Sequence, residues 1–409
     1  MMADVSVLDV FLYGEPVGSL TRVAGDRTLF AFNESYVADP QRPILSLGFK
    51  DKHGGLLTDF QPTQTRLLPF FSNLLPEGHL REYLASRAGV NPLREFFLLQ
   101  ALGDDLPGAI TVKPAGVASL DDDGESAAMR DAERRQDAAL RFSLAGVQLK
   151  FSAIAAPGGG LTIPARGVGG SWIIKLPSAR FASVPENEYS MMTLARFIGM
   201  DVPALRLVDP RTIQNLPAGL DHHAGPALAV ERFDRLADGL TVHIEDFAQV
   251  FREYPERKYE KASMRSLARV IAAECQESDI VEFIRRLTFN MLIGNADMHL
   301  KNWSLIYPDR RAAALAPAYD FVSTISYLKD EKAALTVSRS KCFDDFSIDE
   351  LSHLAAKAML PEKLVLDTAR ETVALFHQHW QAQKTHLPLS NMIIEAIERH
   401  LKSVPIAMI

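Results

Sequence analysis

Residues 290–304 read NMLIGNADMHLKNWS, and residues 318–321 read AYDF. The first stretch places a carboxylate at Asp297 and an amide five residues later at Asn302, and the second adds a carboxylate at Asp320. Phosphoryl transfer uses such a set, because one carboxylate orients the attacking hydroxyl while an amide and a second carboxylate hold magnesium against the phosphates. The catalytic loop of protein kinases has the same five-residue step from Asp to Asn.

The chain before this loop predicts an amphipathic helix. Apolar residues recur there at helical spacing, Ser278 is a candidate N-cap, and Gly294 is a candidate C-cap. A polar cluster at the end of a buried helix favours a functional site over a surface turn. Val322 stands where glycine would complete an Asp-Phe-Gly motif, so the pattern departs from the ordinary kinase signature.

Two other interpretations of the loop stay open. Gly, Asn and Asp form turns, so residues 294–297 are also compatible with a plain helix cap and turn. That interpretation explains neither Asn302 at its spacing nor the carboxylate of Asp320. Asp297 and His299 alternatively resemble part of a metal-hydrolase site, but two ligands without a third make a weak case for zinc.

The whole chain has the composition of a globular protein. Its 409 residues suit two or three domains, and 47% of them are hydrophobic while 23% are charged. The net charge of -7 argues against strong nucleic-acid binding by this chain alone. Two distant cysteines suggest neither a disulfide framework nor a zinc site. No signal peptide or membrane-spanning run is evident, so we expect a protein of the cytoplasm.

The order of predicted elements gives the fold class. We predict an α+β protein with a bilobal protein-kinase-like fold, a small N-terminal mixed α/β domain and a mainly helical C-terminal lobe. The predicted divisions are a domain at 1–118, a charged linker at 119–138, a kinase N-lobe at 139–245 and a helical C-lobe at 246–409. The main predicted helices cover residues 70–87, 94–102, 244–251, 263–275, 361–383 and 390–403.

Three segments before the loop are candidates for nucleotide binding. Residues 140–151 combine small residues with Lys150, as a phosphate-covering loop requires, although the segment taken alone favours a plain hairpin. Lys175 stands in an apolar strand, where a lysine is costly to bury unless it is paired. Glu186 or Glu188 in the next helix is its candidate partner. The strand over residues 226–233 ends where a hinge between two lobes would lie.

Taken together, these motifs resemble the HipA toxin kinases of bacterial toxin–antitoxin pairs over nearly the full length. The stretches that carry the resemblance, in the family's order, are YGEPVGSL, FFSNLLPEG, LPGAITV, FSLAGVQLK, WIIKLP, NEY, LAVERFDR, EDFAQVF, RKYE, GNADMHLKNWS and AYDF. Each piece is weak alone, but the ordered set is specific.

The resemblance implies a role for each matching residue. Asp297 would be the catalytic aspartate, and Asn302 and Asp320 would hold Mg²⁺. Lys175 would contact ATP phosphates, and Ser143 would be an autophosphorylation site whose modification inactivates the kinase. The remaining ATP-binding candidates are Ala145, Gly146, Gln148, Lys150, Glu188, Glu231, Phe233, His299 and Lys301, together with Ser143 itself; among them Glu231 and Phe233 would meet adenine through the hinge backbone.

The resemblance also implies a biological setting. Family members phosphorylate translation components, notably aminoacyl-tRNA synthetases such as the glutamyl enzyme, and so stop growth. Their usual partner is HipB, a helix-turn-helix antitoxin that supplies affinity for operator DNA. After RKYE this chain continues with residues 261–265, KASMR, where some members have a Gly-Pro turn, which puts the protein target in doubt. A small-molecule phosphotransferase and a non-catalytic corepressor are the alternatives to a protein kinase.

Overall fold

The computed structural model describes residues 6–116, 149–156, 158–164, 170–178, 180–217, 220, 225–328 and 332–409. Within it the chain forms two compact units. The first comprises Met1–Arg180, Asp209–Ala224 and Asp234–Pro255, and the second comprises Phe181–Val208, Gly225–Phe233 and Glu256–Ile409. The predicted linker at 119–138 lies outside the described residues, and the predicted domain boundaries stay a prediction.

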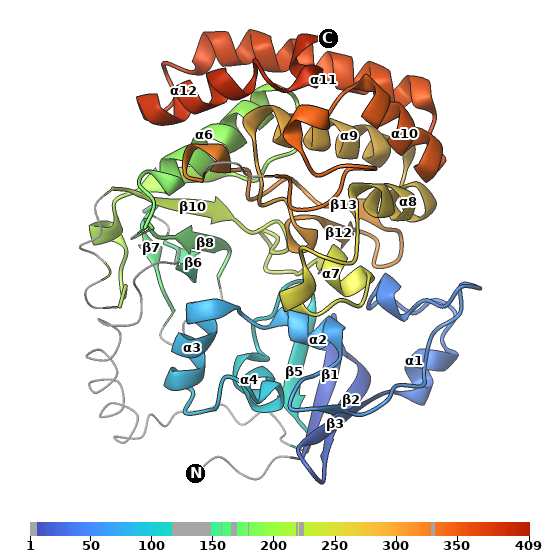
Figure 1. The fold of residues 1–409 in the computed structure, drawn as a ribbon. Coiled ribbons are helices and arrows are strands. Elements are labelled where there is room, and N and C mark those ends of the chain that lie inside the picture. The colour runs from blue at the N-terminus through green and yellow to red at the C-terminus, as the bar shows by residue number, and fades with distance from the viewer. Residues whose placement is uncertain are drawn as a thin grey trace. The chain divides into compact units, whose positions relative to one another are not determined.

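The first unit begins with an antiparallel sheet of order β4-β3-β2-β1-β5 (Figure 1). Its strands are β1 (Val7–Leu12), β2 (Glu15–Val23), β3 (Arg27–Phe32), β4 (Thr63–Gln64) and β5 (Ile110–Pro114). Alternate residues of β1 are fully buried, as expected of a sheet with one face on a core. Tyr13 and Gly14 both have positive φ, which suits the tight turn between β1 and β2 that the sequence predicts.

Helices cover the sequence between β3 and β5. They are α1 (Glu34–Ala38), α2 (Pro69–Leu74), α3 (Gly78–Arg87) and α4 (Glu95–Leu102), with a 3₁₀ turn η1 (Leu47–Phe49). The segment 70–87 therefore forms two helices, with Pro76 between them. Proline removes a backbone donor and disfavours helical conformation in the residue before it, which explains the break.

The remainder of the first unit is made of short strands. β6 (Lys150–Ala155) pairs antiparallel with β7 (Leu161–Thr162) and with β8 (Trp172–Lys175). Further along lie η2 (Pro210–Thr212), β11 (His243–Asp246) and α7 (Phe247–Val250), with η3 (Pro255–Arg257) at the end of the unit. The helix predicted at 244–251 is wrong in its first half: β11 continues to Asp246, whose side chain caps α7 in a capping box.

Buried carboxylates in residues 234–255 bond to the N-terminal domain inside this unit. The carboxylate of Glu245, 1% exposed, accepts hydrogen bonds from the Ser46 hydroxyl and from Leu47 N–H. Asp234, 4% exposed, accepts Gly108 N–H at 2.8 Å. Because a buried charge needs partners, these contacts hold residues 234–245 against residues 46–108 within the first compact unit.

The second unit contains α6 (Val184–Phe197), the antiparallel pair β9 (Leu205–Val208) and β10 (Ala227–Glu231), and the strands β12 (Ser304–Tyr307) and β13 (Ala314–Leu315). Its other helices are α8 (Met264–Glu274), α9 (Glu277–Ile293), α10 (Ile348–Ala358), α11 (Glu362–Gln383) and α12 (Asn391–His400). Short 3₁₀ turns are η4 (Leu300–Asn302), η5 (Thr324–Ser326), η6 (Phe343–Asp345) and η7 (Pro405–Met408).

Helix α9 is the centre of the second unit and packs against α8, α11 and α12 (Figure 1). Its apolar stripe is buried, as predicted, but Gln276 rather than Ser278 is the N-cap, in a capping box with Asp279. Gly294 ends the helix in the left-handed conformation, as predicted. A Cβ there would lie 2.6 Å from Ile325 Cδ1, so glycine is required both for the positive φ and for the lack of space. No described helix is long and apolar enough to cross a membrane.

Candidate active site

Buried amide side chains bond the loop after α9 to the last turn of that helix. Asn295, 1% exposed, donates from Nδ2 to Oδ1 of Asn290 on α9 at 2.7 Å. Oδ1 of Asn295 accepts the N–H of Asp297 at 2.9 Å. The helix therefore fixes the backbone of Asp297, while the Asp297 side chain stays 54% exposed. The loop presents one carboxylate on a rigid support.

Asn302 is tied back to the same aspartate. Its Nδ2 donates to the Asp297 carbonyl oxygen at 2.7 Å, and its N–H donates to the His299 carbonyl at 3.0 Å. The bond to Asp297 uses the amide nitrogen, so the amide oxygen is the atom that Asn302 would offer a metal ion. A hydrogen bond therefore joins the two ends of the five-residue step, Asp297 and Asn302. A plain turn does not require such a bond.

Asp320 lies in a segment bonded to this loop. Tyr319 donates its hydroxyl to the Lys301 carbonyl at 2.9 Å, and Asn295 Nδ2 lies 3.5 Å from the Asp320 carbonyl oxygen. Phe321, 4% exposed, packs against Phe289 of α9 at a ring distance of 5.4 Å. The structure therefore brings the loop of Asp297 and the segment of Asp320 together within the second unit.

Asp320 also has a strained backbone, with φ of 57°. A non-glycine residue in the left-handed region costs about 1–2 kcal/mol, although aspartate tolerates it better than most. Such strain persists where the surrounding contacts impose it, and it is concentrated at functional sites. It is consistent with a carboxylate whose direction matters.

Two aromatic groups flank Asp297. Tyr259 donates its phenolic O–H to Oδ1 of Asp297 at 2.6 Å, and His299 Nε2 lies 3.9 Å from the same oxygen. The two rings meet edge to face at 5.0 Å. His299 is 6% exposed, so it is placed as a packing and polar neighbour of the carboxylate. In the sequence, Tyr259 stands out only as part of the RKYE motif, and no pattern predicts its contact with Asp297.

Two lysines of the first unit face one another. Lys150 in β6 is directly opposite Lys175 in β8, and opposed residues of an antiparallel pair project from the same face. Lys175 is 5% exposed. The pairing suits a site for phosphates.

The other ATP-binding candidates lie in the second unit or outside the described residues. Glu188 on α6 is 2% exposed, and burial raises the pKa of Glu186 above its usual value. Glu231 donates its N–H to the Ala204 carbonyl at 2.8 Å, and the chain passes from the second unit to the first directly after Phe233. Ser143, Ala145, Gly146 and Gln148 lie outside the described residues. Whether Lys175 pairs with Glu188 stays a prediction.

In the part of the chain that the structure describes, Asp297 and His299 have no third ligand for a zinc site. Among the residues that the structure describes, no group of three or more His, Cys, Asp or Glu side chains is placed to hold a metal ion. The oxygen atoms of Asn302 and Asp320 are instead the hard ligands that Mg²⁺ prefers, and magnesium needs only one or two protein ligands when phosphates and water complete its shell.

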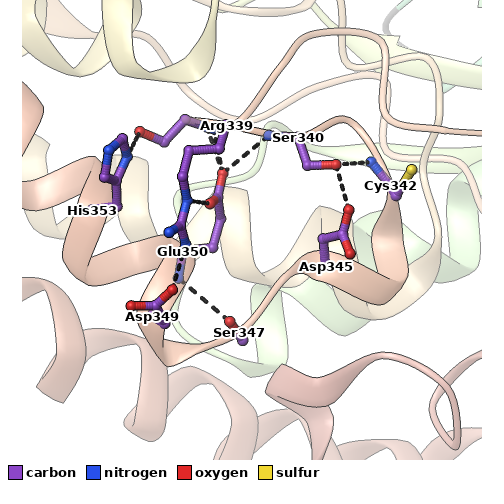
Figure 2. Close-up of polar contacts among 9 residues, drawn as sticks. Arg339, Ser340, Cys342, Asp345, Ser347, Asp349, Glu350 and His353 are labelled. Carbon is purple, nitrogen blue, oxygen red and sulfur yellow. Dashed lines mark hydrogen bonds and ion pairs between the residues drawn. The ribbon is translucent and has the colours of Figure 1, made fainter.

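The segment after the Asp-Phe pair is anchored by a buried glutamate, Glu350 of α10 (Figure 2). Glu350 is 2% exposed and accepts the N–H groups of Ser338 and Arg339 at 2.8 and 2.7 Å. Its other oxygen accepts Nε of Arg339 at 2.7 Å. Burial raises the pKa of Glu350, but these donors outweigh burial and leave the pKa below the usual glutamate value.

Replacing Glu350 with alanine is expected to lower the free energy of unfolding of the second unit by about 3 kcal/mol, because buried N–H groups lose their acceptor. The lowered pKa means that the stabilisation is complete above the unfolded value near about 4.3 and is lost as the pH falls through the folded value. Denaturant unfolding at pH 7 and pH 3 measures both effects. Glu362→Ala, at an exposed glutamate in the first turn of α11, is the control, and an equal loss there would contradict the prediction.

The chain is similar to known proteins over most of its length. The family model for the HipA-like C-terminal domain matches residues 142–380, and that for the HipA N-terminal domain matches residues 8–113. A Sinorhizobium fredii protein named "Putative kinase Y4dM" is 57% identical over 406 residues, which cover 98% of each chain. The "Serine/threonine-protein kinase toxin HipA" of Shewanella oneidensis is 27% identical over 319 residues, 70% of this chain and 69% of that one.

A solved structure has the same fold. HipA of Shewanella oneidensis, in a complex with HipB and operator DNA, superposes with a TM-score of 0.74 at 22% identity and covers 97% of this chain and 98% of its own. This likeness confirms the predicted α+β, kinase-like fold with an N-terminal mixed domain and a mainly helical C-terminal lobe. With both family models matched in order, the chain belongs to the HipA family of toxin kinases.

Proposed function

We propose that the protein is the toxin of a type II toxin–antitoxin pair and a Mg²⁺- and ATP-dependent serine/threonine protein kinase of the cytoplasm. Its target would be a translation component, with an aminoacyl-tRNA synthetase such as the glutamyl enzyme as the first candidate. The observation that carries the proposal is the closed Asp297–Asn302 loop, bonded to the segment of Asp320. The first alternative, a small-molecule phosphotransferase, shares this loop but gives no role to Ser143.

The residues divide the chemistry among them. Asp297 would orient the substrate hydroxyl and receive its proton, while Asn302 and Asp320 would hold the metal by their oxygen atoms. Magnesium bound there supplies charge that neutralises the phosphates. Lys175 and Lys150, opposed on one face of the β6–β8 pair, would bind phosphate oxygens of ATP. The buried position of Lys175 favours this role, because a desolvated ammonium gains most from an anionic partner.

We propose a HipB-like helix-turn-helix antitoxin as the partner. The related structure from Shewanella oneidensis contains HipA, HipB and operator DNA, which supports a similar complex here. The net charge of -7 disfavours strong contact of this chain alone with DNA, so binding to an operator would depend mainly on the antitoxin.

Incubation with Mg²⁺ and ATP is expected to add one phosphate to the unmodified protein, at Ser143. The phosphate would bring about two negative charges to the place where the phosphates of ATP bind, so the modified kinase would lose activity. Intact mass and peptide mapping measure the adduct, and Ser143→Ala should remove it while Ser152→Ala, in the described strand β6, should not. Phosphorylation of sugars or antibiotics in place of protein would overturn the proposal in favour of a small-molecule phosphotransferase.

A further inference from the structure

The catalytic candidate Asp297 has one polar contact that its proposed role does not explain. The phenolic O–H of Tyr259 lies 2.6 Å from Oδ1 of Asp297, a length typical of a hydrogen bond to an ionised carboxylate. The Asp297 side chain is 54% exposed, and the terminal torsion of an aspartate is broad and easily rotated in water. A bond to one oxygen limits that rotation and fixes the direction of the other oxygen.

Tyr259 is itself held from several sides. Its ring packs edge to face on His299 at 5.0 Å, and its carbonyl oxygen accepts a hydrogen bond from Lys341 Nζ at 3.2 Å. The preceding carbonyl, of Lys258, accepts Leu300 N–H at 3.2 Å. The backbone at Tyr259 is therefore bonded both to the loop and to Lys341, while the tyrosine side chain, 41% exposed, packs on His299.

Lys341 belongs to segment 338–341, in which the N–H groups of Ser338 and Arg339 donate to Glu350. Its ammonium group also donates to the Ala334 carbonyl at 2.8 Å. Lys341 therefore links the backbone at Ala334 to the backbone at Tyr259. A continuous set of contacts thus runs from Glu350 through residues 338–341 and Tyr259 to Asp297, all inside the second unit. Through these contacts the buried carboxylate of Glu350 on α10 supports the exposed carboxylate of Asp297 in the loop.

We propose that Tyr259 is a positioning residue for phosphoryl transfer: it occupies Oδ1 of Asp297 and so directs Oδ2 toward the substrate hydroxyl. This inference rests on the proposed kinase function. The competing interpretation is that Tyr259 fills the place of the substrate hydroxyl and must leave before reaction. The backbone bonds at Lys258 and Tyr259 and the packing on His299 favour a tyrosine that stays.

The test removes the hydroxyl and keeps the ring. In Tyr259→Phe, the self-phosphorylation rate at saturating Mg²⁺-ATP is expected to fall about ten- to a hundredfold, the value of a hydrogen bond to a charged group. The ATP concentration for half-maximal rate should not change, because Tyr259 contacts the aspartate and not the nucleotide. Tyr36→Phe is the matched control, since it removes a hydroxyl with an equally short bond to the Pro43 carbonyl, 2.6 Å, in the first unit.

Asp297→Ala alone and combined with Tyr259→Phe completes the experiment. The double variant should transfer phosphate no more slowly than Asp297→Ala, and the falls in melting temperature of the two single variants should not add. An unchanged or increased rate in Tyr259→Phe, beside an active wild type, overturns the positioning role alone. A wild type that transfers no phosphate overturns the proposed function as well, while the melting temperatures still report the contact between the two residues.

Discussion

Asp297→Ala is expected to lower the rate of phosphoryl transfer by about 10²–10⁴-fold, the contribution of a positioned general base. The loss should appear in the rate at saturating ATP, because in the proposed mechanism the aspartate would orient the hydroxyl and other residues would hold the nucleotide. Stability should change by no more than about 0.5 kcal/mol, since the side chain is 54% exposed and its backbone is held through Asn295. Phosphate incorporation and denaturant unfolding measure the two effects.

Asp309→Ala provides the matched control for this variant. Asp309 is also an exposed aspartate in a turn, where its side chain accepts the N–H groups of Arg311 and Ala312 at 2.9 and 2.6 Å. Its replacement should leave the transfer rate unchanged. If Asp297→Ala retained the full rate on protein shown to be unmodified at the start, Asp297 would not be the catalytic residue. A loss of growth inhibition in cells expressing Asp297→Ala would further exclude a purely non-catalytic corepressor.

Asp234→Ala is expected to destabilise the first unit by about 3 kcal/mol, the lower end of the cost of breaking a buried ion pair. Asp234 accepts Gly108 N–H at 2.8 Å and Nη1 of Arg235 at 2.9 Å. Without it, the N–H loses its acceptor, whereas Arg235 keeps its 2.8 Å contact with Asp105. That remaining pair is why the effect should lie at the lower end.

Hydrogen exchange distinguishes local from general loss in this variant. Protection should fall in residues 105–113, because Asp234 bonds to Gly108 while Arg235 bonds to Asp105 and Leu106 within the first unit. Asp238→Ala is the control, as this exposed aspartate only accepts Leu240 N–H at 3.0 Å. Equal unfolding free energies for Asp234→Ala and wild type would show that the N-terminal domain does not depend on this contact.

Much of the helical framework could be predicted because its signals are local. The apolar stripe of α9 and the C-cap at Gly294 follow from spacing and from the need for positive φ. The exact N-cap did not: Ser278 has a preferred capping side chain, but the helix begins after Gln276, whose N–H donates to Asp279 in a capping box. Residues 244–246 were predicted as helix, but they end strand β11, and α7 begins only after the capping box at Asp246.

The candidate site was only partly accessible in this way. Asp297, Asn302 and Asp320 were found because phosphoryl transfer demands those residue types in that order. Tyr259 lies 38 residues before its partner, so no periodicity or spacing links them, and only the folded chain places the phenol against the carboxylate.

The sequence by itself determined the family, the order of the elements and the identity of the acidic and amide residues of the loop, because these depend on residue type and local spacing. The tertiary structure decided which groups hold those residues in place. Asn295 bonds the loop to α9, and Tyr259 donates to the carboxylate of Asp297. Glu350 holds the segment that begins at Ser338. Tyr259 and Asp297 lie 38 residues apart, and burial makes the hydrogen bonds of Asn295 and Glu350 necessary, which no local pattern records.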